Sequence, residues 1–172
     1  MNSRERRSRE AQARAAPLGS TDPELREMMQ RAVELHRDSR IDQAMAAYEA
    51  VLAREPRHAD ALQFMGVVKM QRGHSDEAIG LLKQAVGVEP KNSQAHYNLG
   101  LVMRTEGKEI KALASFRRAI AVEPLNFEAH NAIAGILLAA PDQLGMAEAH
   151  IRHALENNPK YTPALNSLAL LL

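Results

Sequence analysis

Seven histidines are the residues of this chain best suited to chemistry, because an imidazole can bind a metal or exchange a proton near neutral pH. His150 and His153 are three residues apart, a spacing that places both rings on one face of a helix, where they could share an ion. Zinc sites need three or four ligands, and the chain offers no cysteine and no third ligand at an obvious spacing. The pair therefore predicts surface histidines, no metal site and no cofactor.

The sequence contains no catalytic constellation that we recognise. No nucleophile stands near a base in a known pattern, and the nine glycines are regularly spaced instead of clustered in a phosphate-binding loop. His96 and His130 are 34 residues apart at equivalent positions, so we expect their rings to lie near each other. They would either pack with one ring N–H hydrogen-bonded or form a pH-sensitive contact, since neighbouring imidazoliums repel. These observations favour a protein that is not an enzyme.

Composition excludes several other functional classes. The lack of cysteine excludes disulfides and thiol catalysis, and a net charge of +1 gives no polyanion-binding signal. Aromatic residues make up 3% of the chain, too few for a base-stacking platform. No apolar run approaches the roughly 18 residues of a membrane helix, and no apolar stretch follows the N-terminal arginines as it would in a secretory signal. We therefore expect a cytoplasmic protein that binds neither nucleic acid nor a membrane.

A fixed period organises the chain. Pro56, Pro90, Pro124 and Pro159 are separated by 34, 34 and 35 residues. Small residues return with the same period, in the pairs Gly66 and Gly100, Gly73 and Gly107, Ala78 and Ala112, and Ala85 and Ala119. Each period holds two helical patterns joined by a turn, which is typical of a stacked helical array.

In register, these residues resemble the tetratricopeptide repeat, a helix–turn–helix unit of the same period. When Ala59 is counted as position 1, position 8 is small and position 24 is large, as seen in Ala32 and Tyr48, Gly66 and Leu82, Gly100 and Phe116, and Ala134 and Ile151. The resemblance implies an all-α, right-handed superhelical solenoid, with repeats at about residues 25–58, 59–92, 93–126 and 127–161 and an extra helix at 162–172. Small residues let the helices approach closely, and stacked neighbours share one continuous core.

The resemblance also implies binding of a protein or peptide segment in a concave groove, which the first helix of each repeat would line. The groove residues carried over to this chain are Met29, Val33, Arg37, Gln63, Val67, Met70, Tyr97, Asn98, Leu101, Arg104, Asn131, Gly135, Leu138, Asn166 and Leu170. The apolar members could hold apolar side chains of the bound segment, and the asparagines offer donors and acceptors to its backbone. Met29 and Val33 already break the carboxylate clamp of the family's chaperone-binding members, and only Asn98 fits the asparagine ladder of its glycosyltransferase members.

Local signals predict how the helices begin and end. Thr21 with Glu24 fits a capping box for the first helix. In the second repeat, Gly73 is expected to end the first helix in a left-handed conformation, and Ser75 or Asp76 to cap the next one. Ser39 stands where the turn glycine of the first repeat belongs.

Two further residues depart from the repeat pattern. Lys69 occupies a position that is usually apolar, so we expect its stem to lie along the edge of the core with the amine in water. Pro141 replaces the turn glycine of the fourth repeat and must end the helix before it.

The two ends of the chain leave alternatives open. Residues 1–20 are rich in arginine and predict a disordered tail, with an arm for RNA or a membrane surface as the alternative. The final segment, Leu165–Leu172, is apolar nearly all round, which the closing helix of an array normally is not. Either further helices follow it, or it docks on a second copy in a homo-oligomer. Residues 59–73 also resemble repeats that precede sulfotransferase or glycosyltransferase domains in bacterial proteins, so the chain could be the N-terminal recognition region of a larger enzyme.

Overall fold

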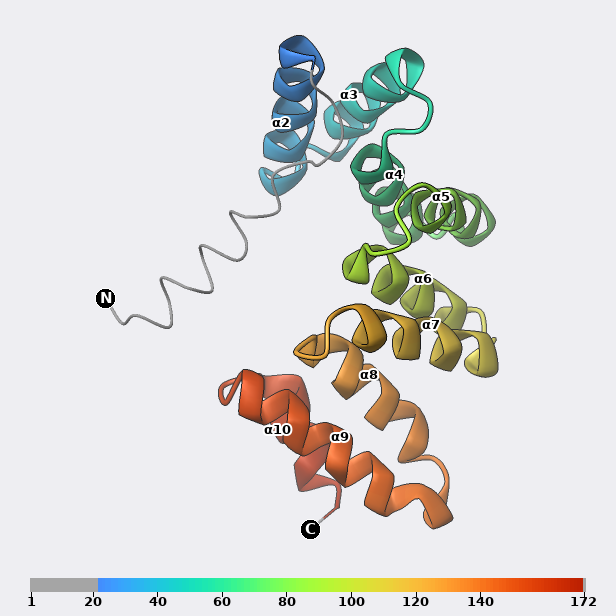
Figure 1. Cartoon of the computed structure of the whole chain (residues 1–172), viewed down its shortest axis with the longest axis vertical. Helices are drawn as coiled ribbons and strands as arrows, with labels where there is room; N and C mark the ends of the chain where they lie inside the picture. Colours follow the sequence, from blue (N-terminus) through green and yellow to red (C-terminus); the bar gives the residue numbers. More distant parts are fainter. Residues whose placement is uncertain (1–21, 172) are drawn as a thin grey trace, which may run out of the picture.

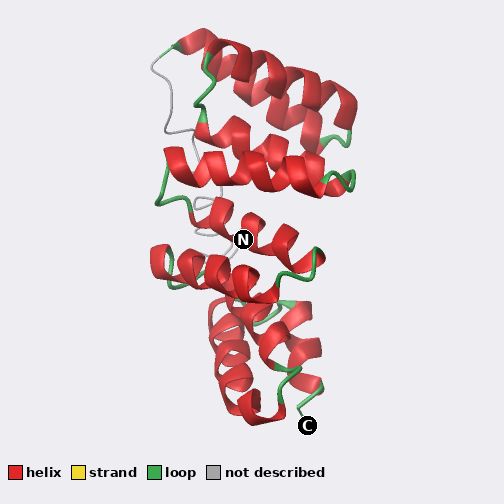
Figure 2. Cartoon of the chain, turned by 90° about the vertical axis from the view of Figure 1, so that its right-hand side faces the viewer, coloured by secondary structure: helices red, strands yellow, loops and turns green. Residues whose placement is uncertain are grey.

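The described part of the chain is built from helices alone. The computed structural model describes residues 22–171, and its elements are α2 (Pro23–Arg37), α3 (Ile41–Arg54), α4 (Ala59–Gln71), α5 (Ser75–Val88), α6 (Ser93–Thr105), α7 (Glu109–Val122), α8 (Phe127–Leu137), the short 3₁₀ helix η1 (Pro141–Gln143), α9 (Leu144–Asn157) and α10 (Thr162–Ala169). Figure 2 shows the helices stacked along one direction. The prediction of an all-α solenoid is confirmed.

The first helix of each of the first three pairs ends in the same left-handed turn. Ser39, Gly73 and Gly107 have φ angles of 59°, 77° and 68°. In the second pair the N–H of His74 donates to the carbonyl of Lys69 at 2.9 Å, the bond that closes this type of turn. The fourth pair differs as predicted, because α8 ends at Leu137 and η1 begins at Pro141.

Two predicted helix starts differ from those observed. Asp22 caps α2 by accepting a hydrogen bond from the N–H of Glu24 at 3.0 Å, whereas Thr21 lies outside the described residues. The N-cap of α5 is His74, which makes no capping hydrogen bond, so neither Ser75 nor Asp76 has the predicted role. Side-chain caps occur instead on the first helices of later pairs, where Asn92 accepts from Ala95 and Asn126 accepts from Ala129, each at 2.8 Å.

Close approach of the two helices in a pair depends on the small residues at position 8. A Cβ atom added to Gly100 would lie 2.5 Å from a ring carbon of Phe116, and one added to Gly66 would lie 2.7 Å from Cγ of Leu82. Both large partners are fully buried. The contacts between small and large residues that the repeat pattern predicts are therefore present.

A buried polar network joins the third and fourth pairs. The side-chain amide of Asn126 donates to the hydroxyl of Ser93 at 2.8 Å, and that hydroxyl donates to the carbonyl of Ala119 at 3.2 Å. Because all three groups lie inside the stack, the network fixes how α8 sits against α6 and α7.

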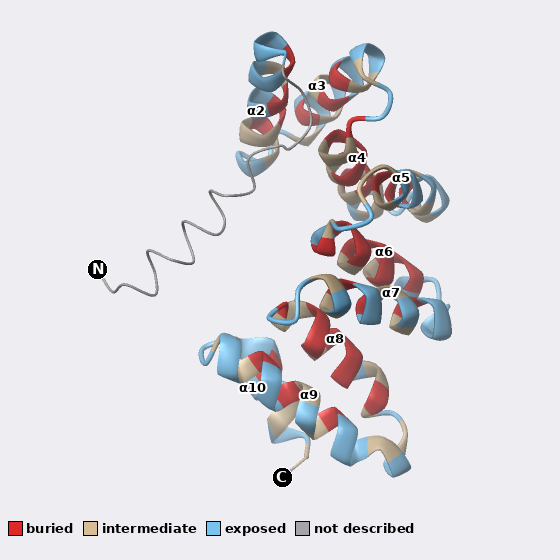
Figure 3. Cartoon of the chain, in the orientation of Figure 1, coloured by how far each residue is buried: buried red, intermediate tan, exposed pale blue. Residues whose placement is uncertain are grey.

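The pairs follow an open arc. Each helix packs on its neighbours along the chain, and the first helices of successive pairs also touch, α4 with α6, α6 with α8, and α8 with α10. In Figure 1 the ends of the stack lie apart, and α2 and α4 lie on the hollow side relative to α3 and α5. Figure 3 shows buried residues running through the stack from pair to pair, so the described residues form a shared core and not a closed bundle.

The last helix is covered on one side only. Leu168 and Leu171 pack against a core of Ala134, Ile151 and their neighbours, whereas Leu165 and Leu170 are 43% and 78% exposed. The predicted N-terminal tail, residues 1–20, lies outside the described residues. Within residues 22–171 we find no helix with the length and hydropathy needed to cross a lipid bilayer.

Candidate binding groove

The residues predicted to line a groove belong to α2, α4, α6, α8 and α10, the first helices of the pairs and the closing helix. Half-buried members are Val33, Val67, Met70, Tyr97, Leu101, Asn131 and Leu138, and exposed members are Arg37, Arg104, Gly135, Asn166 and Leu170. The contacts of α4 with α6, of α6 with α8 and of α8 with α10 place these helices next to one another, and Figure 1 shows α2 on the same hollow side as α4. Twelve of the predicted residues are therefore at least partly accessible to solvent, and whether they bind a partner stays a prediction.

Three of the predicted residues are buried. Met29 is 2% exposed and packs in the core between α2, α3 and α4, so it has almost no surface left for a bound segment. Gln63 and Asn98 are buried too, and Asn98 accepts a hydrogen bond from the amide of Gln94 at 3.4 Å. Helical spacing alone could not separate these buried positions from the accessible ones on the same helices.

An apolar stripe crosses the first helices. Val33, Leu101 and Leu138 are half-buried and pack against the core with one side, while Val67 is half-buried between them. Part of each side chain still faces water, so contact with another apolar surface would remove more area from solvent.

Aromatic rings support the N-terminal end of this face. Tyr48 and Phe64 stack with ring centroids 5.8 Å apart, and the ring of His36 packs edge-on against both. Nδ1 of His36 lies 3.3 Å from the hydroxyl of Tyr48, and burial lowers the pKa of this histidine. Burial in this cluster therefore favours the neutral form of His36.

The C-terminal end of the face carries polar groups on an apolar base. Tyr97 packs on Phe116 with ring centroids 5.7 Å apart, and burial, together with the negative charges of Tyr161 and Glu128, raises the pKa of Tyr97 to about 12. The hydroxyl of Tyr97 therefore stays protonated and can donate a hydrogen bond at neutral pH.

α8 and α10 are joined across this end. The hydroxyl of Ser167 donates to the side-chain oxygen of Asn131 at 3.1 Å, and Asn166 beside it is exposed. Tyr161, which packs edge-on against Phe127 with centroids 4.9 Å apart, also belongs to this region. The set of groove residues carried over from the resemblance did not include Tyr161, because it lies in the turn before α10 and not on a first helix.

A histidine cluster lies behind the groove, where α8 meets α9. Nδ1 of His130 lies 2.9 Å from Nδ1 of His150, and its ring centroid is 5.2 Å from that of His153. Burial and the positive charges of His130, His153 and Arg117 lower the pKa of His150 to about 4. The pKa of His130 is lowered by burial as well.

The fold also brings His130, which sequence spacing did not link to His150 and His153, next to these two rings. Nε2 of His130 is 3.1 Å from the carbonyl of Pro124, to which it donates, so its Nδ1 accepts from His150. Both ring nitrogens of His130 are thus engaged, and no group of described residues is arranged to hold a metal ion.

The expected partner of His130 was His96. Among the described residues, however, the ring contacts of His130 are with His150 and His153. His96 instead lies with Nε2 3.0 Å from the carbonyl of Pro90, a single ring hydrogen bond that matches the packing interpretation.

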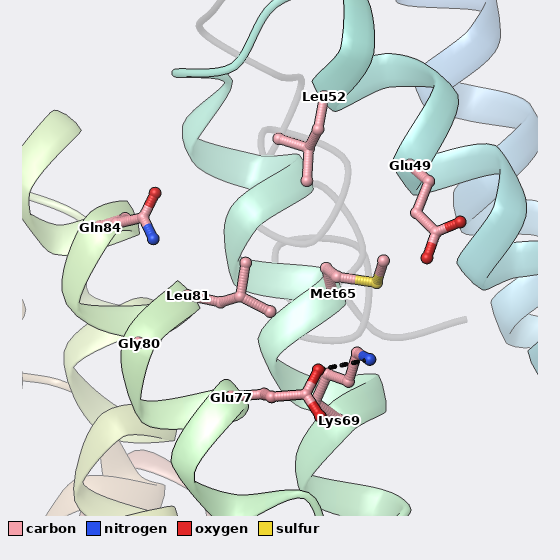
Figure 4. Close-up of a pocket in the computed structure, with 8 residues that line it drawn as sticks. All are labelled: Glu49, Leu52, Met65, Lys69, Glu77, Gly80, Leu81 and Gln84. Carbon is pink, nitrogen blue, oxygen red and sulfur yellow. Dashed lines mark ion pairs between the residues drawn. The ribbon is translucent and has the colours of Figure 1, made fainter.

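A second hollow lies between α3, α4 and α5. It has a volume of about 440 Å³ and is lined by Glu49, Leu52, Met65, Lys69, Glu77, Gly80, Leu81 and Gln84. Figure 4 shows the amine of Lys69 turned toward Glu77, 2.6 Å from its carboxylate oxygen. The prediction for Lys69 did not include this ion pair, which forms because Glu77, eight residues along the chain, comes back to Lys69 across the turn.

Comparison with known proteins identifies the repeated unit. Two family models, both described as tetratricopeptide repeat, match residues 35–100 and residues 93–124, and together they span just over half of the chain. A comparison with curated proteins finds no match.

Solved structures resemble the whole stack. PilW, a type IV pilus biogenesis factor, superposes with a TM-score of 0.77 at 22% identity, covering 88% of this chain and 70% of its own. YrrB, described as a repeat protein of the same kind with an unusual peptide-binding site, gives a TM-score of 0.67 at 21% identity, with 84% and 74% covered. An O-GlcNAc transferase variant from Thermobaculum terrenum gives 0.69 at 26% identity, with 80% of this chain but only 26% of that chain covered.

Proposed function

The chain is a tetratricopeptide repeat protein, and on that premise we propose that it is a non-catalytic scaffold that binds a peptide or partner segment in its concave groove. The proposal draws support from the peptide-binding site that is named for YrrB, a protein of similar fold. We found no catalytic constellation in the sequence, and the described residues hold no cluster suited to a metal.

One observation carries the proposal. A stripe of half-buried apolar side chains is formed by Val33 on α2, Val67 on α4, Leu101 on α6 and Leu138 directly after α8. A bound segment would bury the part of each side chain that still faces water, which contributes about 25 cal/mol per Å² of apolar area. Amides beside the stripe, such as that of Asn166, can pair with the backbone of the segment.

The groove is tested by placing charge on its apolar stripe. We expect the double variant Val67→Glu, Leu101→Glu to lose capture of the partner from the native cell, because the carboxylates would have to be desolvated on binding. The far-UV circular dichroism of the variant should match that of the unaltered protein, since both side chains are only half-buried.

A matched control introduces the same charge elsewhere. Ile110 begins the exposed side of α7, is 87% exposed, and lies on a second helix outside the stripe. Ile110→Glu should capture the same partner as the unaltered chain. Capture that survives the groove variant but fails with the control would place the binding surface outside the groove.

A second candidate is that the repeats serve as the recognition region of a larger glycosyltransferase- or sulfotransferase-type enzyme. The match to O-GlcNAc transferase favours it, because this chain spans about a quarter of that structure. Sequencing the coding frame beyond Leu172 tests it. A following transferase domain would support this candidate, and a stop codon directly after Leu172 would exclude it.

Location and partner class rest on the sequence. We propose a cytoplasmic protein whose partner is a protein or peptide, with no nucleic acid or membrane bound. Cell fractionation should recover the protein in the cytosolic fraction, free of nucleic acid. Recovery with the membranes would contradict this part of the proposal.

A further inference from the structure

Arg104 is a cation of the groove without a carboxylate partner among the described residues. It is exposed at the end of α6, and no ion pair within residues 22–171 includes it. The other arginine of the groove, Arg37, contacts the carboxylate of Asp38 at 4.0 Å. Arg104 therefore keeps an unneutralised charge on the inner face.

The surroundings of Arg104 hold its guanidinium over the neighbouring pair. A Cβ atom added to Gly135 would lie 3.7 Å from a terminal nitrogen of Arg104, so this arginine reaches from α6 across α8. Gly135 is exposed and has no side chain, so α8 presents only backbone to Arg104 at this position. The charge of Arg104 is also felt by Tyr97 and Tyr161, whose pKa values it draws down against the rise caused by burial.

Glu128, an acidic residue on the same helix as Gly135, forms no ion pair with Arg104. Glu128 lies in the first turn of α8, seven residues before Gly135. At about 1.5 Å of rise per residue, the two positions are roughly 10 Å apart along the helix. Most of the length of α8 thus separates Glu128 from Gly135, the position that the guanidinium of Arg104 approaches.

We infer that Arg104 pairs with the carboxylate of an acidic side chain, Asp or Glu, in the segment that the groove binds. The inference rests on the proposed function and names the chemistry of its partner. A guanidinium presents a planar fork of donors that matches a carboxylate with two parallel hydrogen bonds. The hydroxyl of Tyr97, which stays protonated, is a further donor on this face, and the apolar side chain of Leu101 lies one helical turn before Arg104.

Phage-displayed random dodecapeptides test the inference without knowledge of the natural partner. The full chain is used as the target, and the peptides are joined to the coat protein through their C-termini, so no free C-terminal carboxylate is present. Groove ligands are defined as the peptides that bind the unaltered chain but do not bind the double variant Val67→Glu, Leu101→Glu. We expect these ligands to share an acidic residue at one position.

Affinities of a synthetic, C-terminally amidated ligand then locate the contact. Replacing its shared acid by the matching amide should weaken binding at least about tenfold, as expected for a charge-assisted hydrogen bond. Arg104→Gln should weaken binding of the acidic peptide by the same factor as the change from acid to amide does. The amide peptide should bind Arg104→Gln and the unaltered chain with the same affinity. Arg104→Lys should recover part of the loss. The control Arg118→Gln, at an exposed arginine of α7 outside the groove, should change nothing.

The outcomes separate the inference from the function beneath it. Groove ligands without a shared acid, or ligands equally weakened by Arg118→Gln, would overturn the pairing and leave groove binding intact. Failure to recover any peptide that the groove variant loses would overturn both. Binding tightened more than about tenfold by phosphoserine at the acidic position would show that the site prefers a phosphate.

Discussion

Gly100 allows the sharpest test of how this array is packed. Its backbone lies so close to α7 that an added Cβ atom would sit 2.5, 2.6 and 2.9 Å from three ring carbons of Phe116. Phe116 is fully buried, so its ring has no free space into which to turn. Gly100→Ala must therefore push the two helices apart or strain the ring.

Two opposing effects set the size of the change. Overpacking a filled core costs about 1–3 kcal/mol, whereas replacing glycine by alanine inside a helix stabilises it by about 1 kcal/mol. Gly80 isolates the second effect, because it lies within α5 and an added Cβ atom would meet nothing within 4 Å. We expect Gly80→Ala to raise the free energy of unfolding and Gly100→Ala to lower it, with the two variants differing by about 1–3 kcal/mol.

Urea unfolding followed by far-UV circular dichroism measures this difference. The fourth repeat, which has Ala134 and Ile151 at the equivalent positions, suggests a rescue. When Phe116 is replaced by isoleucine, Gly100→Ala should lower the free energy of unfolding much less than it does when Phe116 is present. A double-mutant cycle measures this coupling. Equal stabilisation by Gly80→Ala and Gly100→Ala would refute the close contact on which the argument depends.

Three further predictions concern the histidine cluster, the end of the array and the second hollow. The pKa values of His130 and His150 are lowered in the folded chain, to about 4 for His150, so the unfolded chain binds more protons as the pH falls. The free energy of unfolding, measured with urea, should therefore fall by about 1 kcal/mol between about pH 6.5 and pH 4. The fall should be much smaller in His150→Gln. If the closing helix joins two copies, Leu165→Asp with Leu170→Asp should reduce the mass found by sedimentation, and an unchanged mass would exclude that interface. Lys69→Met should change the free energy of unfolding by less than about 1.5 kcal/mol, because an apolar side chain of similar length can replace an ion pair at the edge of a core. A larger loss in urea unfolding would show that the contact with Glu77 is essential.

Features that follow from the repeat could be predicted from the sequence. The left-handed turns at Gly73 and Gly107 and the contact of Gly100 with Phe116 occur where the period places them. The turn at Ser39 shows that the period is stronger evidence than the residue type, because serine takes a conformation there that glycine usually provides.

Features that depend on how the pairs sit against each other could not be predicted. His130 and His150 come from different helices, and their contact requires the angle at which α8 meets α9. Arg104 was assigned to the groove, but its position over Gly135 depends on the stacking of two pairs. Met29 shares the helical face of Val33, yet it is buried, because α2 is rotated so that this edge of the face enters the core.

Photo-crosslinking in the native cell tests the central claim that the inner face binds a partner. A photoreactive phenylalanine analogue is placed at Leu101 on the apolar stripe or, as a control, at the exposed Ile110 on α7. We predict that irradiation joins a partner protein to the chain from the position of Leu101 and not from that of Ile110. Adducts that form from Ile110 while Leu101 gives none would contradict the claim.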